Sequence, residues 1–193
     1  KSIRPALPGI DLPGIFQLRT VPDARAIREW LERGSLFLAG MDKYSGFQTI
    51  RPKTRAVVVG GGFIGVESAE NLVHREFDVT LVEMADQVLA PLDKDMAVVV
   101  EDDLGRHGVR VALNDGVAAF EQGDEGSLNV RTKSGKVYPA DVVILALGVR
   151  PDTDLARAAG LQIGERGGIR VDDQMRTSHA DIFAVGDAVE VKD

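Results

Sequence analysis

Two kinds of apolar pattern alternate along the middle of the chain. Continuous apolar runs, rich in β-branched residues, are typical of strands buried on both faces; they lie at residues 55–59, 78–83, 109–113 and 142–147. Apolar residues at helical spacing follow the first two runs, at 66–76 and 93–107. This alternation predicts parallel strands joined by right-handed crossovers.

The pattern changes between the third and fourth runs. Short alternating segments at 117–121, 128–132 and 136–138 are separated by glycine-containing turns. They predict an antiparallel meander in the place where another crossover helix could stand. The predicted fold class is therefore α/β: a Rossmann-type parallel sheet with helices on both faces and an antiparallel β-meander.

The flanking segments have weaker patterns. We expect a strand at 15–18 and a helix that begins near Thr20 and ends at Gly34. Residues 35–53 have no clear period and are expected to form a loop that could include one helical turn. Near the C-terminus the pattern predicts a helix at 152–159 and strands at 169–171 and 182–185.

Composition narrows the function classes. The 193 residues are 44% hydrophobic, enough for a core, and the net charge of −7 argues against nucleic acid or an anionic membrane as the partner. No apolar run approaches the ~20 residues of a membrane span, and no signal peptide is visible. The chain has no cysteine, which excludes disulfides and thiol chemistry within it and fits a cytoplasmic origin. Its three histidines lack metal-ligand spacing, so we expect no metal site.

A glycine pattern lies between the first buried strand and its helix. Gly60 allows a tight turn, Gly62 lets the backbone approach a pyrophosphate, and Gly65 lets the helix pack on the strand. The helix N-terminus offers free N–H groups to phosphate. Glu83 ends the second strand, 18 residues beyond Gly65, near the ~20 expected of a ribose-binding carboxylate. A glycine turn without a ligand is the alternative.

Glu83 also bears on the choice of cofactor. A carboxylate there accepts hydrogen bonds from ribose hydroxyls and repels a 2′-phosphate, and no Arg or Lys follows it until Lys94. The sequence therefore favours NAD over NADP. The alternative is a solvated acid at the end of a strand.

Other candidate residues are weaker on physical grounds alone. Glu67 could be an ordinary first-turn acid favoured by the helix dipole, and Phe63 could pack against neighbouring turns. The segment 177–187 is a polar loop, a short apolar strand and then Gly186-Asp187. That glycine permits close approach of a ligand, and Asp187 could accept hydrogen bonds from hydroxyls.

Together these motifs resemble the pyridine nucleotide–disulfide oxidoreductases, a flavoprotein family, and cover nearly the whole chain except about 35–53. Residues 55–67 resemble the NAD-binding segment of the family, and 146–153 resemble the exit from its NAD domain. Residues 79–83 and 91–97 look most like the coenzyme A disulfide reductase and NADH oxidase branch. Residues 177–187 are similar to the second flavin motif.

The resemblance implies roles for individual residues. Phe63 matches an aromatic that gates the nicotinamide pocket, Glu67 an acid that orients the nicotinamide, and Gly148 a residue beside the dinucleotide. Asp187, with Gly186, matches the aspartate that holds the FAD ribitol. The NAD-binding residues implied are Gly60, Gly62, Phe63, Ile64, Gly65, Glu67, Glu83 and Gly148.

The departures from the family pattern imply a fragment. The first flavin-binding motif, the redox cysteine and the dimerisation domain are absent from the sequence. We therefore expect a flavin-domain remnant or linker at 1–15, an NAD(H)-binding domain at 16–150 and a partial flavin-domain segment at 151–193. No catalytic residue is assigned.

The expected function follows from this organisation. The parent would pass hydride from NADH to FAD and then to a thiol-type or oxygen acceptor, as an oxidoreductase that forms a homodimer. The fragment itself would bind NADH, require the rest of the flavoenzyme for FAD and catalyse nothing. Two alternatives stay open: an NAD-sensing regulatory module, against which the flavin-like motif argues, and a small NAD-dependent dehydrogenase with its own substrate site.

Overall fold

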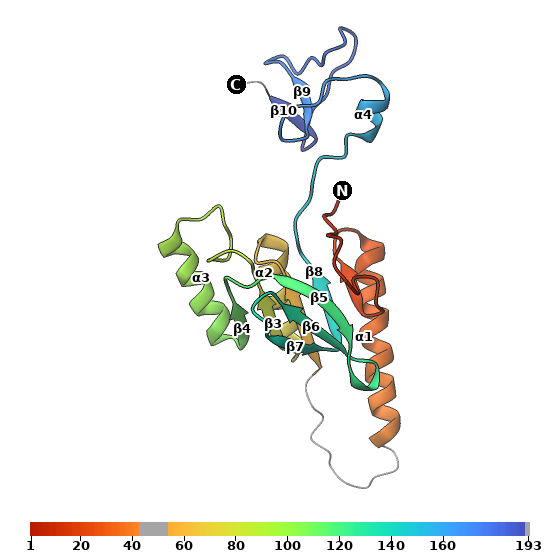
Figure 1. Cartoon of the computed structure of the whole chain (residues 1–193), viewed down its shortest axis with the longest axis vertical. Coiled ribbons are helices and arrows are strands. Elements are labelled where there is room, and N and C mark those ends of the chain that lie inside the picture. Colours follow the sequence, from red (N-terminus) through yellow and green to blue (C-terminus); the bar gives the residue numbers. More distant parts are fainter. Residues whose placement is uncertain (43–53, 192–193) are drawn as a thin grey trace. The chain divides into compact units, whose positions relative to one another are not determined.

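The computed structural model describes residues 1–42 and 54–191, without the side chains of residues 33–42 and 125. The chain divides into two compact units. The larger unit is Arg4–Gly148, and the smaller unit is Lys1–Ile3 with Val149–Asp193 (Figure 1). No helix within the described ranges is both long and apolar enough to cross a membrane.

A five-stranded sheet organises the larger unit, and every neighbouring pair of its strands is parallel. The predicted parallel sheet is therefore confirmed. In spatial order its strands are β1 (Ile15–Gln17), β8 (Val142–Leu145), β2 (Arg55–Val59), β3 (Asp78–Val82) and β4 (Val109–Ala112).

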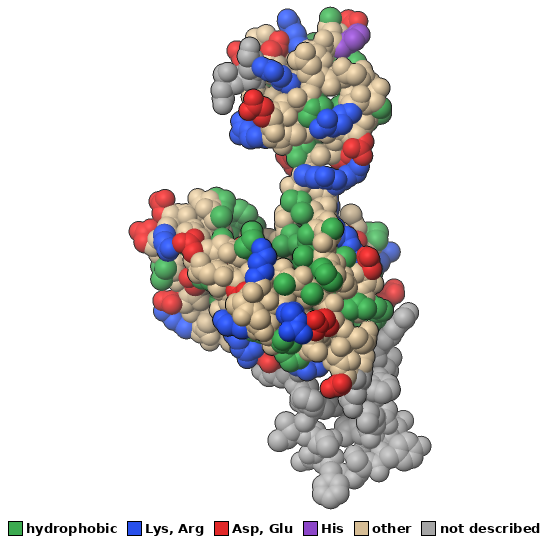
Figure 2. Space-filling view, in the orientation of Figure 1, with side chains coloured by type: hydrophobic (Ala, Val, Ile, Leu, Met, Phe, Trp, Pro, Cys, Tyr) green, Lys and Arg blue, Asp and Glu red, His purple; other side chains and the backbone are tan. Residues whose placement is uncertain are grey.

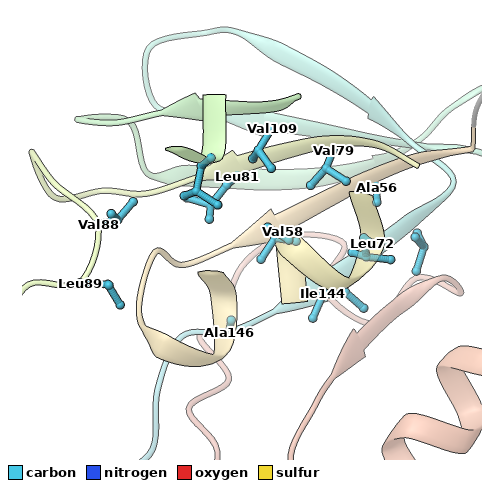
Figure 3. Packing of buried hydrophobic residues seen from close by; sticks show 13 residues of the cluster. Ala56, Val58, Leu72, Val79, Leu81, Val88, Leu89, Val109, Ile144 and Ala146 are labelled. Atoms are coloured by element: carbon cyan, nitrogen blue, oxygen red, sulfur yellow. The ribbon is translucent and has the colours of Figure 1, made fainter. Parts of the chain in front are cut away.

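Alternation of side chains along the strands produces two apolar clusters. In β2, Ala56 and Val58 belong to one cluster, whereas Val57 and Val59 belong to the other. Figure 3 shows the first cluster, in which Leu72 of the neighbouring helix lies near the strand residues Val58 and Ile144. The continuous apolar runs in the sequence arise because both faces of these strands are buried.

Among the residues whose side chains the structure describes, the helices contribute to the first cluster and not to the second. They are α1 (Val21–Asp42), α2 (Phe63–His74) and α3 (Lys94–Arg106). The connections from β1 to β2, β3 and β4 all advance in the same direction across the sheet, so right-handed crossovers place these helices on one face. The sequence predicts helices on both faces of the sheet, but the structure places a different element on the second face.

That element is the antiparallel meander, which is confirmed. Its strands are β5 (Val117–Gln122), β6 (Leu128–Thr132) and β7 (Val137–Ala140), with a short 3₁₀ turn, η1 (Asp124–Gly126), between the first two. Phe120, Leu128 and Val130 pack in the second cluster. The path from β4 back to β8 reverses direction across the sheet, so a right-handed connection must run over the opposite face.

The smaller unit has little regular structure. It contains α4 (Asp154–Ala158) and two parallel strands, β9 (Ile169–Val171) and β10 (Val189–Val191). Lys1 joins the unit through ion pairs with Asp152, at 3.1 Å, and with Asp154. These pairs raise the pKa of Lys1, chiefly through its hydrogen bond to Asp154, and lower the pKa of Asp154.

Helix α1 does not end at Gly34, as the sequence predicted, but continues to Asp42. Residues 35–42 of the predicted loop are therefore helical. An internal glycine costs a helix only about 1 kcal/mol, and the Leu and Ala that follow are strong helix formers. The rest of the predicted loop, 43–53, lies outside the described residues.

The predicted strand at 182–185 was also wrong. Its backbone pairs locally instead: Thr177 donates to the Ile182 carbonyl oxygen at 3.0 Å, and Ala184 donates to the Met175 carbonyl oxygen at 3.1 Å. Met175 has a positive φ of 62° and Gly186 one of 89°, and such turns prevent an extended ladder. The strand that forms is β10, three residues beyond Gly186.

Candidate nucleotide-binding site

The carboxyl ends of β2 and β8 are adjacent at the point where the strand order reverses. From β2 the chain moves to β3 on one side, and β8 lies on the other side. In open α/β sheets, ligands bind in the crevice at such a switch point. Gly60 follows β2, and the segment that ends at Gly148 follows β8, so the predicted glycine pattern lies at this edge.

Gly60 and Gly65 are required by the packing of the turn itself. Gly60 has a φ of 108°, and a Cβ on it would collide with the backbone carbonyl of Ala146. A Cβ on Gly65 would collide with the carbonyl oxygen of Gly60. These two glycines let β2, β8 and the first turn of α2 approach one another closely.

Gly62 differs from both of them. A Cβ built on Gly62 would meet nothing within 4 Å, and its φ of −75° suits any residue. Gly62 is the N-cap of α2, and no side chain caps the helix there. Space therefore lies beside a helix N-terminus whose first N–H groups lack a side-chain acceptor, which is the arrangement that binds phosphate.

Glu83, directly after β3, is held against this turn. Its Oε2 accepts a hydrogen bond from the Gly61 N–H at 2.5 Å, and its Oε1 accepts one from the Ala85 N–H at 2.7 Å. Gly61 is also constrained, since a Cβ there would lie 3.2 Å from Glu83 Cγ. Both bonds orient the half-buried carboxylate, which keeps further lone pairs for hydroxyl donors.

The other predicted NAD-site residues lie on the same edge. Phe63 and Ile64 open α2 with side chains 65% and 39% exposed, although both are large and apolar. Glu67 is exposed one turn further along, and its side chain has no hydrogen-bond partner among the described residues. Gly148 follows β8 with a φ of 82°. The structure thus brings Gly60, Gly65, Glu83 and the first turn of α2 together, while the roles assigned to these residues stay predictions.

Three residues near Glu83 were missed by sequence reasoning. Met84 is 67% exposed, and Lys133, from the β6–β7 turn, places its Nζ 3.9 Å from the Met84 Sδ. Asp115 is buried behind them and donates its backbone N–H to the Glu83 carbonyl oxygen at 3.1 Å. No sequence motif points to this group, because Lys133 lies in the β6–β7 hairpin, whereas Glu83 follows a strand of the parallel sheet.

Asp115 fastens the β6–β7 turn to this edge. Its Oδ2 accepts from the Ser134 hydroxyl at 2.6 Å, and its Oδ1 accepts from the Ser134 N–H at 3.1 Å. Burial raises the pKa of the Asp115 carboxyl, but these hydrogen bonds outweigh it, and the pKa lies below its ordinary value. The backbone N–H of Lys133 also donates to the Gly116 carbonyl oxygen at 2.8 Å.

The second predicted motif belongs to the smaller unit. Gly186 has a φ of 89° and begins a turn closed by a 3.2 Å hydrogen bond from the Val189 N–H to its carbonyl oxygen. Asp187 is exposed on this turn. The apolar side chains before it are exposed as well, Phe183 by 59% and Val185 by 74%.

Comparison with known proteins defines the class. The family model for the pyridine nucleotide-disulphide oxidoreductases matches residues 1–192, and the chain belongs to that family. The NADH oxidase of Methanocaldococcus jannaschii is 38% identical over 190 residues, covering 98% of this chain and 38% of that protein.

Two solved structures agree with this assignment. Reduced CoADR-RHD from Bacillus anthracis superposes with a TM-score of 0.85 at 42% identity, covering 100% of this chain and 31% of the other. The water-forming NADH oxidase from Lactobacillus brevis, bound to NADH, superposes with a TM-score of 0.81 at 32% identity, covering 98% and 37%. The predicted family and its coenzyme A disulfide reductase and NADH oxidase branch are therefore confirmed.

Membership has two consequences. The family implies NAD(P)H and FAD as cofactors, and its members are oxidoreductases, so the alternative of an NAD-sensing module is not favoured. The chain spans little more than a third of the length of the Methanocaldococcus relative, 38%.

Proposed function

We propose that this chain is the NADH-binding part of a flavin-dependent oxidoreductase. The observation that carries the proposal is the open space at Gly62 beside the oriented carboxylate of Glu83. A dinucleotide needs both features at a fixed separation, one for its pyrophosphate and one for its adenosine ribose. The turn of Gly60 and Gly65, closed by backbone contacts, holds that separation.

The residues of the site fit a nicotinamide dinucleotide. The uncapped N-terminus of α2 receives the pyrophosphate, and Glu83 accepts hydrogen bonds from the ribose hydroxyls. Phe63, exposed at the first turn of α2, is the apolar side chain available to cover the nicotinamide half. Glu67 follows one turn later and supplies an acid without a partner in the described chain.

NADH is proposed as the preferred nucleotide. The carboxylate of Glu83 attracts ribose hydroxyls and repels a phosphate ester on the same ribose. The structurally similar Lactobacillus brevis oxidase is bound to NADH. Preference for NADH over NADPH is therefore assigned to Glu83.

In the proposed enzyme, this chain supplies only part of the flavin site, and other segments of the complete protein supply the rest. Asp187 lies on an exposed turn where it can accept from hydroxyls, and Gly186 leaves its backbone open to close approach. Phe183 and Val185 expose apolar surface beside it, as expected of side chains that another segment covers. When bound, FAD carries electrons between the nicotinamide and a thiol-type or oxygen acceptor. The complete enzyme and its dimeric assembly belong to this proposal.

Titration of NADH and NADPH by calorimetry tests the nucleotide site. A charge-assisted contact from Glu83 stabilises bound NADH by roughly 1.5–3 kcal/mol, so Glu83→Ala weakens NADH binding about 10- to 100-fold. NADPH binding holds steady or improves, because the repulsion of the 2′-phosphate is removed.

The matched control is Glu70→Ala, an exposed acid on α2 away from the turn, which leaves both affinities unchanged. Glu83→Gln removes the charge but keeps one carbonyl oxygen to accept from the Gly61 N–H. It therefore distinguishes the effect of the charge on binding from the effect of a disturbed turn. If Glu83→Ala weakens NADH and NADPH equally, or neither, Glu83 is only a solvated strand end and the proposal fails.

A further inference from the structure

The fold brings a cation to Met84, the residue that follows the proposed ribose carboxylate Glu83, from a hairpin about 50 residues further along the chain. Lys133 Nζ lies 3.9 Å from the sulfur of Met84, the residue next to Glu83. Lys94, the next base along the chain, is instead ion-paired with Asp86. That pair raises the pKa of Lys94 and lowers the pKa of Asp86, chiefly through their hydrogen bond. Among the described residues, Lys133 makes no ion pair.

Packing explains how Lys133 reaches this position. Gly116 leaves room for it: a Cβ there would lie 3.3 Å from Met84 Cγ and 3.5 Å from Lys133 Cε. The methylene stem of the lysine therefore passes over Gly116 beside the Met84 side chain. The ammonium group, on a flexible stem, remains exposed.

The turn that carries Lys133 is fixed relative to Glu83. Asp115 bonds to the Glu83 carbonyl oxygen through its backbone and to Ser134 through its carboxylate. The backbone of Lys133 bonds to Gly116. A short chain of hydrogen bonds thus connects the Glu83 backbone to the β6–β7 turn, so the fold sets the separation between the backbones of Glu83 and Lys133.

From this placement we infer that Lys133 determines how well the site accepts a phosphate on the 2′-oxygen of the adenosine ribose. The inference rests on the proposed nucleotide site. In NADPH the esterified oxygen is one of the two hydroxyl oxygens that Glu83 engages in NADH, so the 2′-phosphate must lie close to that carboxylate. Lys133, whose Nζ lies against Met84 next to Glu83, makes no ion pair in the described chain, whereas Lys94 is paired with Asp86. Glu83 sets the preference for NADH, and Lys133 limits how strongly NADPH is excluded.

Calorimetric titration of both nucleotides tests the inference. Lys133→Ala weakens NADPH binding by up to about fivefold, the effect of one exposed charge on a phosphate, and leaves NADH binding unchanged. Lys133→Arg restores NADPH binding, because the charge is kept. Lys136→Ala removes an exposed lysine of the same hairpin and leaves both affinities unchanged. High salt reduces the effect of Lys133→Ala on NADPH.

NADPH is expected to bind the wild-type chain weakly, so the same substitution is also tested in the Glu83→Ala variant. There the repulsion of the 2′-phosphate is gone, and Lys133→Ala again weakens NADPH without weakening NADH. Equal weakening of both nucleotides, or no effect in either background, overturns the role of Lys133. Failure of NADH to bind the wild-type chain would instead overturn the nucleotide site and this inference with it.

Discussion

At the scale of single residues, the glycines of one turn have separate tasks. Gly65 has no room for a side chain, because the carbonyl oxygen of Gly60 occupies that position. Gly62 has a φ of −75°, and no atom lies within 4 Å of the point where its Cβ would stand. The fold therefore explains the glycine at 65 but not the one at 62, for which we propose a bound ligand as the reason.

Substitution of each glycine by alanine should separate binding from folding. Gly62→Ala changes the free energy of unfolding by less than about 1 kcal/mol, since its backbone suits alanine, but lowers NADH affinity at least about tenfold because the methyl group fills space needed by the pyrophosphate. Gly65→Ala destabilises the fold by about 1–3 kcal/mol through overpacking. Urea unfolding and calorimetry measure the two quantities.

The opposite pattern would contradict this division. If Gly62→Ala destabilises the chain as much as Gly65→Ala does, Gly62 is a structural glycine. If Gly62→Ala unfolds normally and binds NADH as the wild type does, the pyrophosphate does not pass over this turn. Either result removes the observation on which the proposed function rests.

At the scale of elements, Asp115 links three segments of the chain. Its backbone reaches the segment after β3, and its carboxylate reaches Ser134 in the β6–β7 turn. The carboxylate is buried, and its pKa is low because the hydrogen bonds from Ser134 outweigh the effect of burial. The meander is thereby attached to the sheet at the edge where Glu83 lies.

We expect Asp115→Asn to lower the free energy of unfolding by about 1–3 kcal/mol at neutral pH, since an amide cannot accept from both Ser134 donors. The folded pKa is depressed, so the unfolded chain takes up this proton first as the pH falls. The stabilisation is therefore complete above about pH 4 and is lost as the pH falls through the folded pKa. Urea midpoints measured against pH should show the two proteins converge under acid conditions.

Asp124→Asn in the exposed η1 turn is the control, and we expect it to leave the stability unchanged across this range. A difference between wild type and Asp115→Asn that stays constant into strong acid would show that the Asp115 carboxylate is not the source of the effect.

Elements with local causes could be predicted from the sequence. Strands β2, β3 and β8 bury both faces, so their apolar runs mark them directly. The turn after β2 could be predicted from its glycines, and the position of Glu83 from the usual spacing of a strand–helix–strand unit. The end of α1 could not be predicted, because a single glycine weakens a helix without ending it.

Contacts made across the sequence could not be predicted. Lys133 reaches Met84 only because Asp115 and Gly116 set the position of the β6–β7 turn, and nothing in the local pattern shows that contact. Likewise β10 pairs in parallel with β9, which lies about 20 residues earlier in the sequence. The more apolar segment 182–185 instead forms hydrogen bonds with the loop directly before it. In both cases the structure of a segment depends on the distant residues that it contacts, and not on its own secondary-structure propensity.

At the scale of the whole molecule, the two units differ in how many hydrophobic side chains they bury. The larger unit carries both apolar clusters. In the smaller unit Ala156 and Val171 are the buried hydrophobic residues among those described, while Leu155 is 85% exposed. Figure 2 shows apolar side chains at the surface among interspersed acidic and basic ones. The smaller unit therefore has surface for further protein to cover, in agreement with its proposed share in a flavin site.

This difference leads to a prediction for the chain as it stands. Asp187, the carboxylate proposed for the flavin site, is exposed, so purified chain should show no flavin absorption after gel filtration and no NADH-dependent reduction of disulfide, persulfide or oxygen. Without a cysteine, the chain has no thiol to receive electrons beside the nicotinamide. NADH should nevertheless bind, since Gly62 and Glu83 belong to the larger unit. Stoichiometric flavin, or turnover above a heat-denatured control, would show that these residues make a more complete site than we propose, whereas absence of NADH binding would remove the nucleotide site itself.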